Sequence, residues 1–149
     1  MSVKDIDKGW KELKREVRAI KNARIEVGVI GSQAQSRPYD GPLTIADVAT
    51  FNEFGTVNAP ARSFIRSTFD ENQNYVSYVE RKASLLTKGV PARTILKIIG
   101  TKIKQDVVAK INNLRVPPNA ASTIARKKSS NPLIENGRLK QSISYRIKK

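Results

Sequence analysis

The chain has 149 residues, of which 39% are apolar, and it carries a formal net charge of +15 at pH 7. This length suits one domain with its own hydrophobic core, and the absence of cysteine excludes disulfides and thiolate metal sites. Histidine is also absent, so the chain lacks the commonest general base near neutral pH and the commonest metal ligand.

Residues 3–21 predict an amphipathic N-terminal helix. Lysine and arginine cover most of its polar surface, and such a basic helix either packs its apolar stripe on protein or lies on a membrane. We expect packing on a core or a neighbouring subunit. The stripe recurs at helical spacings of four and three and comprises Ile6, Trp10, Leu13, Val17 and Ile20.

Residues 25–30 predict a β-strand, because they are mostly apolar and β-branched. Residues 31–42 show no periodicity and are rich in Ser, Gln, Pro, Asp and Gly, which predicts a mobile loop of about a dozen residues. Loops of this length often serve in binding. Gly28, Gly31 and Gly41 do not form a phosphate-binding loop, since no Gly-Lys-Ser/Thr follows them.

The stretch from residue 44 to residue 66 predicts a helix, a glycine stop, a proline-led crossing and the start of a second helix. Thr44 and Asp47 have the spacing of a capping box. Gly55 stands where a left-handed C-cap would end the first helix, and Ser63 can cap the second. The segment sets the angle between two elements and offers no reactive group.

Two longer helices are expected next. A helical stripe predicts that the helix capped by Ser63 continues to about residue 87, and Gly89 and Pro91 separate it from a third helix over 91–114. Gly100 falls inside this third helix, where glycine costs about 1 kcal/mol relative to alanine. We therefore expect another backbone to pack closely against Gly100.

The C-terminal part predicts a short helix or turn within 119–128, a mobile basic loop at about 126–132 and a turn at Asn136-Gly137. Residues 142–147 alternate strictly, as a half-buried strand does. We expect this strand to pair antiparallel with 25–30. The predicted fold is a single α+β domain, in which a small antiparallel sheet packs against three longer helices.

No catalytic, cofactor-binding or metal-binding site is expected, and hence no enzymatic activity. A metal-dependent nuclease needs converging carboxylates, for which Glu53, Asp70 and Glu71 are the candidates. Asp70 and Glu71 are adjacent, so they point about 100° apart on a helix and do not share a face. Helix caps and solvated surfaces explain all three residues.

A candidate subunit or partner interface includes residues around the central crossing. Arg62 and Arg66 lie at a helix start, where the dipole disfavours cations. They are either surface charges or ligands for a carboxylate of a neighbouring subunit, which arginine binds bidentately. Phe64 belongs either to the core or to the interface. The candidate set is Trp10, Phe54, Arg62, Phe64 and Arg66.

The positive charge is unevenly distributed. Residues 1–80 hold 11 basic and 11 acidic side chains, whereas residues 81–149 hold 17 basic and two acidic ones. The excess is either a solvated surface or a contact with nucleic acid or an acidic protein. The candidate contact residues for DNA or an acidic partner are Lys97, Lys104, Arg126, Lys127 and Lys128.

Two sequence blocks carry a resemblance to a known family. The first is Glu53-Phe54-Gly55-Thr56 followed by residues 60–66 (Pro-Ala-Arg-Ser-Phe-Ile-Arg), and the second covers residues 132–143, from Pro-Leu-Ile-Glu-Asn-Gly to Ser-Ile. In this order and separation they resemble the neck and tail-completion proteins of tailed bacteriophages, over roughly residues 25–147. The family more commonly has threonine in place of Asn136 and proline in place of Ser63.

The resemblance implies a structural virion protein that joins head to tail, or completes one end of the tail, as a ring of identical subunits around the DNA path. Its partners would be other neck, portal-side or tail proteins, with nonspecific contact to packaged DNA as a further candidate. The N-terminal helix, the loop 31–42 and the crossing 54–66 are the segments that we assign to such contacts. The protein would be assembled in the bacterial host cytoplasm and located in the virion.

The alternative function is sequence-nonspecific nucleic-acid binding by a protein free in the cell. Only nine aromatic residues are present, without a cluster that would stack bases, which counts against it. No membrane contact is expected, because no run approaches the roughly 20 apolar residues of a membrane span. The N-terminus also lacks the apolar core of a signal peptide.

Overall fold

The computed structural model of the chain describes residues 9–37 and 41–148. Helices account for most of the described residues, and two strands form the only sheet among them. In chain order, the elements are α1 (Trp10–Asn22), β1 (Arg24–Val29), η1 (Gly31–Gln35), α2 (Ile45–Phe54), α3 (Arg66–Glu71), α4 (Tyr75–Ala83), η2 (Ser84–Lys88), α5 (Ala92–Asn113), α6 (Ala121–Lys127), α7 (Arg138–Ser142) and β2 (Ile143–Lys148).

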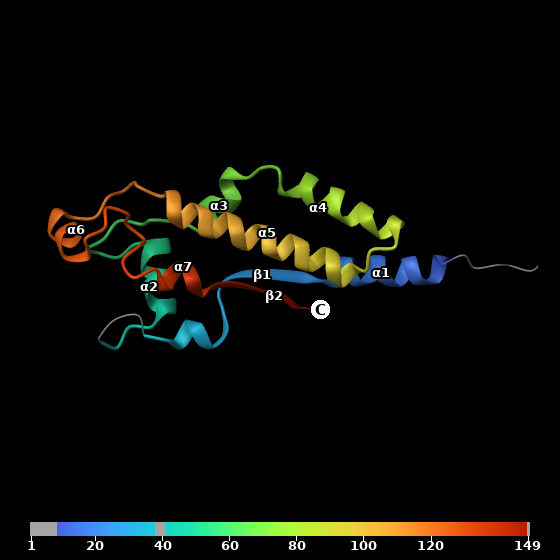
Figure 1. The fold of residues 1–149 in the computed structure, drawn as a ribbon, viewed down its shortest axis with the longest axis horizontal. Helices are drawn as coiled ribbons and strands as arrows, with labels where there is room; N and C mark the ends of the chain where they lie inside the picture. Colours follow the sequence, from blue (N-terminus) through green and yellow to red (C-terminus); the bar gives the residue numbers. More distant parts are fainter. Residues whose placement is uncertain (1–8, 38–40, 149) are drawn as a thin grey trace, which may run out of the picture.

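The predicted α+β class and the antiparallel pairing of the two strands are confirmed. In the register of β1 and β2, Ile25 lies opposite Ile147 and Val29 opposite Ile143. The long helix α5 packs against both strands, and α1 and α4 pack against α5. The molecule is elongated along α5 and the sheet, with α1 at one end and α6 at the other (Figure 1).

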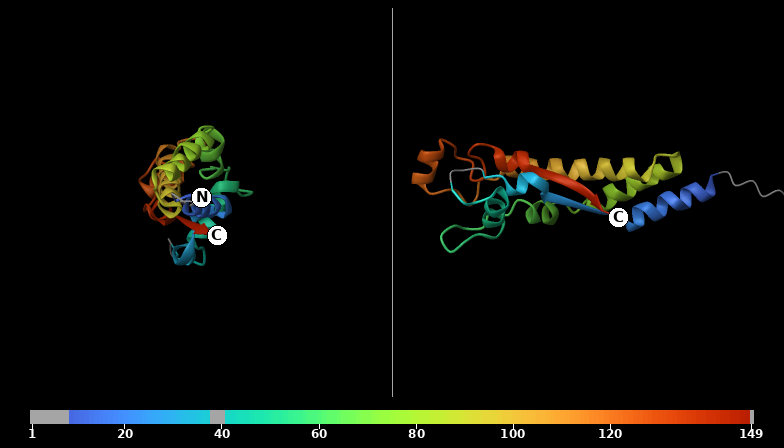
Figure 2. Two further views of the ribbon diagram at one scale, coloured as in Figure 1. Left: turned by 90° about the vertical axis from the view of Figure 1, so that its right-hand side faces the viewer. Right: turned by 90° about the horizontal axis from the view of Figure 1, so that it is seen from below.

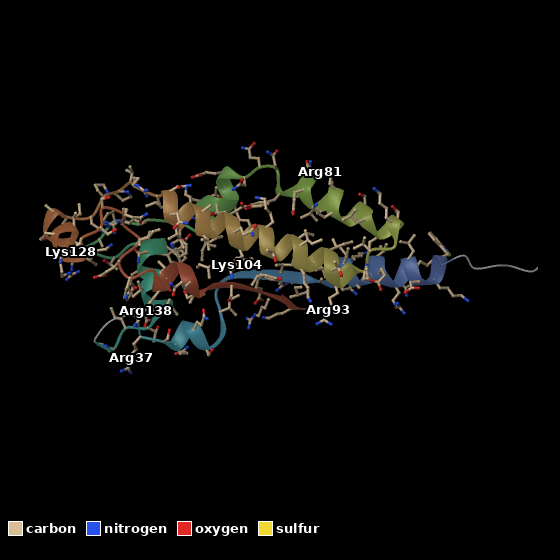
Figure 3. All side chains as sticks on the ribbon, in the orientation of Figure 1. Arg37, Arg81, Arg93, Lys104, Lys128 and Arg138 are labelled. Carbon is tan, nitrogen blue, oxygen red and sulfur yellow. The ribbon has the colours of Figure 1, made fainter. Side chains whose placement is uncertain are left out.

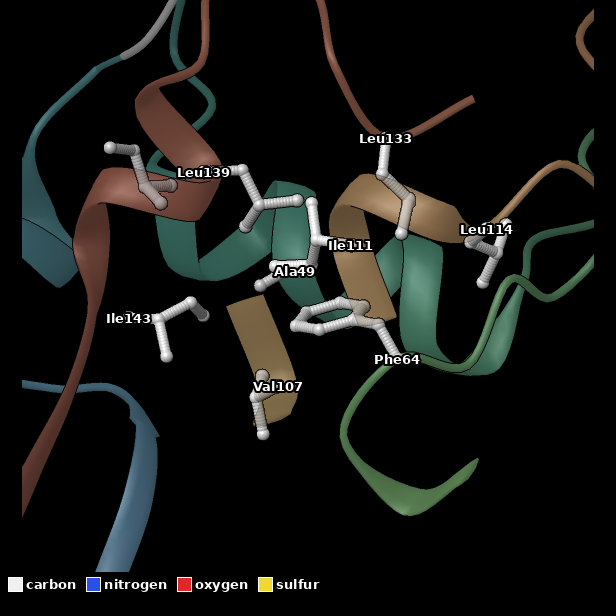
Figure 4. Close-up of a cluster of buried hydrophobic side chains, with 9 residues drawn as sticks. Ala49, Phe64, Val107, Ile111, Leu114, Leu133, Leu139 and Ile143 are labelled. Atoms are coloured by element: carbon white, nitrogen blue, oxygen red, sulfur yellow. The ribbon is translucent and has the colours of Figure 1, made fainter. Parts of the chain in front are cut away.

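Two clusters of buried side chains lie along this axis. The cluster around α2 and the C-terminal half of α5 is drawn in Figure 4, and the cluster at the N-terminal half of α5 is centred on Ile95, Ile99 and Ile103. α5 therefore contributes to both clusters and joins them. The first cluster comprises Ile45, Ala49, Phe64, Val107, Ile111, Leu114, Leu133, Leu139 and Ile143.

The nearest neighbour of Gly100 is an aromatic ring, whereas the sequence predicted close packing against another backbone. A Cβ atom built on Gly100 would lie 2.4 Å from Cδ2 and 2.6 Å from Cε2 of Tyr145 on β2. Real Cβ contacts essentially never fall below 3.0 Å. The absence of a side chain at Gly100 thus lets the ring of Tyr145 on β2 approach α5 closely.

The predicted continuous helix from Ser63 to about residue 87 is interrupted. It is divided into α3, α4 and η2, with the break at Asn72, whose ψ of 74° is not helical. Asparagine favours such breaks because its side chain bonds to nearby backbone, and here Asn72 Nδ2 donates to the carbonyl of Thr68. The break allows α4 to run back along α5, where the Tyr75 hydroxyl donates a 2.8 Å hydrogen bond to Asp106.

The other predicted segments fall close to their expected bounds. The N-terminal helix, predicted over 3–21, is α1 from residue 10, and residues 3–8 lie outside the described part. The predicted loop 31–42 contains η1, and its residues 38–40 are likewise outside the description. Gly55 ends α2 with φ 79° and ψ 177°, so the chain leaves in an extended path and does not form the left-handed cap that we expected.

The segment 126–132, which the sequence predicts to be a mobile loop, is hydrogen-bonded to α5. The buried amide of Asn131 donates from Nδ2 to the carbonyls of Ile111 and Asn112, at 3.1 and 3.0 Å. Its Oδ1 accepts a 2.9 Å hydrogen bond from the backbone of Leu133. One asparagine therefore connects this segment to the C-terminal end of α5.

Candidate functional site

The central crossing is organised around the buried carboxylate of Glu53, at the C-terminal end of α2. Its Oε2 accepts hydrogen bonds from the backbone N–H groups of Phe64 and Ile65, at 2.8 and 2.9 Å. Its Oε1 accepts one from the N–H of Arg66 at 2.9 Å and one from Ser63 Oγ at 2.6 Å. The carboxylate thus satisfies free donors at the start of α3 and fixes α3 to α2.

Burial acts to raise the pKa of Glu53, but the hydrogen bonds from Ser63, Ile65, Arg66 and Phe64 outweigh it and hold the pKa below its ordinary value. Glu53 is therefore an ionised helix cap. It does not converge with the other candidate carboxylates: Asp70 is exposed and Glu71 pairs with Lys110. Within residues 9–37 and 41–148, no cluster of carboxylates is positioned to hold a metal ion.

Arg62 is used inside the chain, which contradicts its assignment to an intersubunit contact. Its side chain is buried, and Nε and Nη2 donate 2.9 Å hydrogen bonds to the carbonyls of Pro117 and Pro118. Burial lowers the pKa of Arg62. The fork of the guanidinium, which we expected to hold a partner's carboxylate, connects the crossing to the segment that follows α5.

Phe64 is a core residue and is removed from the candidate interface. Its side chain is fully buried between α2 and α5, in contact with the same cluster as Ala49, Val107 and Ile111 (Figure 4). The backbone N–H of Phe64 is bound by Glu53, so side chain and backbone are both satisfied within the chain.

The turn that follows α2 presents apolar side chains to solvent, and we call residues 54–59 the finger. Phe54 is 68% exposed, and Val57, which was not among the predicted interface residues, is fully exposed. The finger is rigidly built: Thr56 and Ala59 exchange two backbone hydrogen bonds, and a Cβ on Gly55 would lie 2.8 Å from the backbone N of Ala61. The chain after α2 extends away from the body (Figure 2, right).

Arg66 remains exposed beside the finger. Its backbone is bound by Glu53, while its guanidinium carbon lies 5.9 Å from the centroid of the Phe54 ring. This is a cation–π distance. Two of the predicted interface residues, Phe54 and Arg66, therefore lie together at the surface, and Glu53 is the residue that positions both.

Trp10 belongs to a second exposed apolar surface, at the far end of the molecule. It is 60% exposed at the start of α1, with Lys14 Nζ 4.9 Å from its ring centroid. Together with the η2–α5 connection it lines a groove of about 520 Å³, which we call the N-terminal groove. Its lining includes Trp10, Leu13, Leu86, Val90 and Pro91, with Glu12 and Glu16 from the same helix.

The N-terminal groove is a built feature of the fold. Glu16 Oε2 accepts a 2.7 Å hydrogen bond from the backbone N–H of Ala92, which fixes α1 to the first turn of α5. Ile20, further along α1, packs against the Ile95 cluster. The stripe of α1 is thus divided: its C-terminal part contacts the core, and its N-terminal part lines the groove.

The predicted polyanion-contact residues do not form one patch. Lys97 and Lys104 lie on α5, and Arg126 and Lys128 lie at the α6 end of the molecule (Figure 3). Among the described residues none of these four has an ion-pair partner within 4.0 Å. Their charges are available to a partner, but at two separate places.

Lys127 has a structural role that contradicts its assignment to DNA or an acidic partner. Its half-buried Nζ donates to the carbonyls of Asn131 and Pro132, at 3.2 and 3.1 Å. Burial lowers its pKa, the charge of Glu135 opposes this, and the charges of Arg62 and Arg126 add to it. Lys127 and Asn131 thus both stabilise the 126–132 segment through hydrogen bonds.

None of the described helices combines the length and the apolar composition that crossing a bilayer requires. In comparisons with known proteins, no family model matches the chain, and neither a curated protein nor a solved structure is detectably similar to it.

Proposed function

We propose that this chain is a structural virion protein of a tailed phage, which joins head to tail or completes the tail end as a ring in the neck around the DNA path. It carries out no reaction in this role. Its partners are further copies of itself and other neck, portal-side or tail proteins. It is assembled in the host cytoplasm and is carried in the particle.

The observation that carries the proposal is how the residues of the first resemblance block are used. Glu53 and Arg62 are buried and bind backbone groups, whereas Phe54 and Arg66, in the same block, lie at the surface. The charged side chains of Glu53 and Arg62 thus stabilise the fold through backbone hydrogen bonds. This division supports a role in protein–protein contact.

The second resemblance block supports the same role. Leu133, Leu139 and Ile143, all within residues 132–143, lie in the core cluster that also holds Phe64 of the first block. The two blocks are therefore parts of one packed unit, which presents the finger on its surface. A structural protein built for assembly needs such a rigid unit, because a preorganised surface loses less entropy on binding.

The experiment that tests the proposal is electron microscopy of particles made without this chain. If it joins head to tail, its removal leaves filled heads and separate tails, and the chain supplied in trans restores joined particles. If it completes the tail, its removal leaves tails of wrong length or open ends. Normal, infectious particles in its absence would contradict both forms of the proposal.

Nucleic-acid binding is the second candidate, and the unpaired charges of Lys97, Lys104, Arg126 and Lys128 favour it. Each phosphate neutralised on duplex DNA steepens the dependence of log affinity on log salt by about 0.9. Sedimentation of the chain with a duplex of about 30 base pairs separates the candidates. A salt-sensitive complex of one monomer with DNA supports this role, whereas self-association without DNA binding supports the neck role.

A further inference from the structure

We propose that copies of this chain associate head to tail, with the finger of one copy seated in the N-terminal groove of the next. The inference rests on the homo-oligomer of the proposed function and assigns its interface. Phe54 and Val57 would supply the apolar contact, and Arg66 would face the exposed carboxylate of Glu12.

The finger has the properties of a preformed docking element. Its two apolar side chains are exposed although its backbone is closed by the Thr56–Ala59 bonds and held against Ala61 by Gly55. The Thr56 hydroxyl also accepts from the N–H of Asn58. Ordering a flexible loop opposes binding, and a turn that is already ordered avoids most of that cost.

The N-terminal groove has the matching chemistry. Its apolar lining comes from Trp10 and Leu13 of α1 on one side and from Leu86, Val90 and Pro91 of the η2–α5 connection on the other. Trp10 is more than half exposed in a single chain. Tryptophan is among the residue types most enriched at the positions that dominate binding energy, so this exposed ring suits a contact with a partner. A groove of this volume accommodates one or two side chains of the size of phenylalanine and valine.

Charge favours a second copy as the occupant. Arg66 has no carboxylate partner among the described residues, and it lies against Phe54 at the base of the finger. Glu12 lies on the lining of the groove and is 70% exposed, and among the described residues its ion-pair partner is the equally exposed Arg15. Exposed pairs of this kind contribute at most about 1 kcal/mol, so Glu12 can exchange Arg15 for an incoming arginine at little cost.

The arrangement of the two surfaces determines the kind of assembly. α1 lies at one end of the long axis, while α2 and the finger lie in the other half (Figures 1 and 2). The surfaces differ, so their contact is heterologous and leaves an unused finger on one copy and an unused groove on the other. Such contacts close into a ring or grow into a filament.

Complementary variants test the inference directly. A finger variant combines Phe54→Glu with Val57→Glu and retains its groove, and a groove variant, Trp10→Glu, retains its finger. Val76→Glu is the matched control, because Val76 is as exposed as Phe54 but lies on α4, outside both surfaces. Circular dichroism and thermal unfolding establish that all the variants are folded.

The readout is sedimentation velocity at about 0.3 M NaCl, where a Debye length of roughly 6 Å weakens the repulsion between copies that each carry +15. We expect wild type and Val76→Glu to form higher oligomers and each of the other variants to remain monomeric. An equal mixture of the finger and groove variants keeps one intact interface per pair. It should therefore form dimers and nothing larger.

Three results would overturn the inference. If the finger and groove variants assemble as wild type does, or if their mixture stays monomeric while wild type assembles, the assigned interface is wrong although the proposed ring stands. Wild type that remains monomeric under these conditions also overturns the inference. The virion role is then decided separately, by whether particles made without the chain are defective.

Discussion

Nε of Arg62 donates a 2.9 Å hydrogen bond to the carbonyl of Pro117, 55 residues further along the chain. Nη2 of the same guanidinium reaches the carbonyl of Pro118 at the same distance. Arg62 is a buried cation without an ion-pair partner within 4.0 Å among residues 9–37 and 41–148, and backbone oxygens satisfy its donors. This contact brings the crossing between α2 and α3 to the segment after α5, and the finger is built on that crossing.

Replacement of Arg62 by lysine should destabilise the fold by about 2 kcal/mol. One ammonium group cannot reproduce the fork that binds both carbonyls, so a buried acceptor is left without its donor. Urea unfolding measures the change. Arg66→Lys is the matched control and should cost less than about 0.5 kcal/mol, because the Arg66 side chain is exposed. Equal effects of the two substitutions would contradict the structural role of Arg62.

Glu53→Gln should lower the free energy of unfolding by about 3 kcal/mol at neutral pH. Glutamine has nearly the same shape but presents an amide group to donors that now lack an acceptor, and hydrogen bonds to charged groups contribute about 1.5–3 kcal/mol each. Denaturant unfolding gives the value. Glu80→Gln is the control, since Glu80 is exposed and forms no ion pair among the described residues. A loss for Glu53→Gln no larger than the control's would refute the capping role.

Stability should also depend on pH through Glu53. The folded pKa lies below the ordinary value of 4.5, so the folded state favours the ionised form. The stabilisation is therefore fully present above pH 4.5 and is lost as pH falls through the lowered folded pKa. Unfolding curves recorded from pH 7 to pH 3 should show a steeper loss in wild type than in Glu53→Gln. Parallel curves would show that Glu53 does not contribute through its charge.

Gly100→Ala should destabilise the protein by about 1–3 kcal/mol, although alanine is the better helix former by about 1 kcal/mol. The added Cβ would collide with the ring of Tyr145. Removing the ring should rescue the substitution: in the Tyr145→Ala background, Gly100→Ala should be neutral or stabilising. A double-mutant cycle of thermal unfolding measures this coupling. Additive effects would show that the close approach of the ring is not what requires glycine.

Substitution of the α5 lysines should change DNA binding, whereas substitution of Lys127 should change stability. If the chain binds DNA, Lys97→Ala and Lys104→Ala each should reduce the salt slope by about 0.9, with stability unchanged. Lys127→Met should instead lower stability, because its ammonium group bonds to the carbonyls of Asn131 and Pro132. Lys128→Met, at the exposed neighbouring position, is the matched control. Fluorescence anisotropy with labelled duplex and urea unfolding separate the two effects.

Local signals in the sequence predicted much of the fold. The Thr44–Asp47 capping box is present: Asp47 N–H donates to Thr44 Oγ1, and Thr44 N–H donates to Asp47 Oδ2. The alternation of residues 142–147 and the β-branched run 25–30 correctly predicted the two strands and their pairing. These signals act over a few residues, so a single sequence contains them.

At the candidate site, the main errors concern long-range contacts. The sequence explained Glu53 by a helix cap or a solvated surface, and nothing local indicates that it is buried and bound by four donors from residues 63–66. Arg62 was misassigned because its partners lie 55 residues away, on two prolines that carry no acceptor signal. Val57 was missed because exposure of an apolar residue in a turn has no sequence periodicity. Burial and partners at this range are set by packing.

If this chain is a component of a phage particle, quantitative mass spectrometry of gradient-purified particles should detect it. Its peptides should copurify with infectious particles at a fixed copy number relative to the portal. Peptides that are abundant in infected cells but missing from those particles would contradict this assignment.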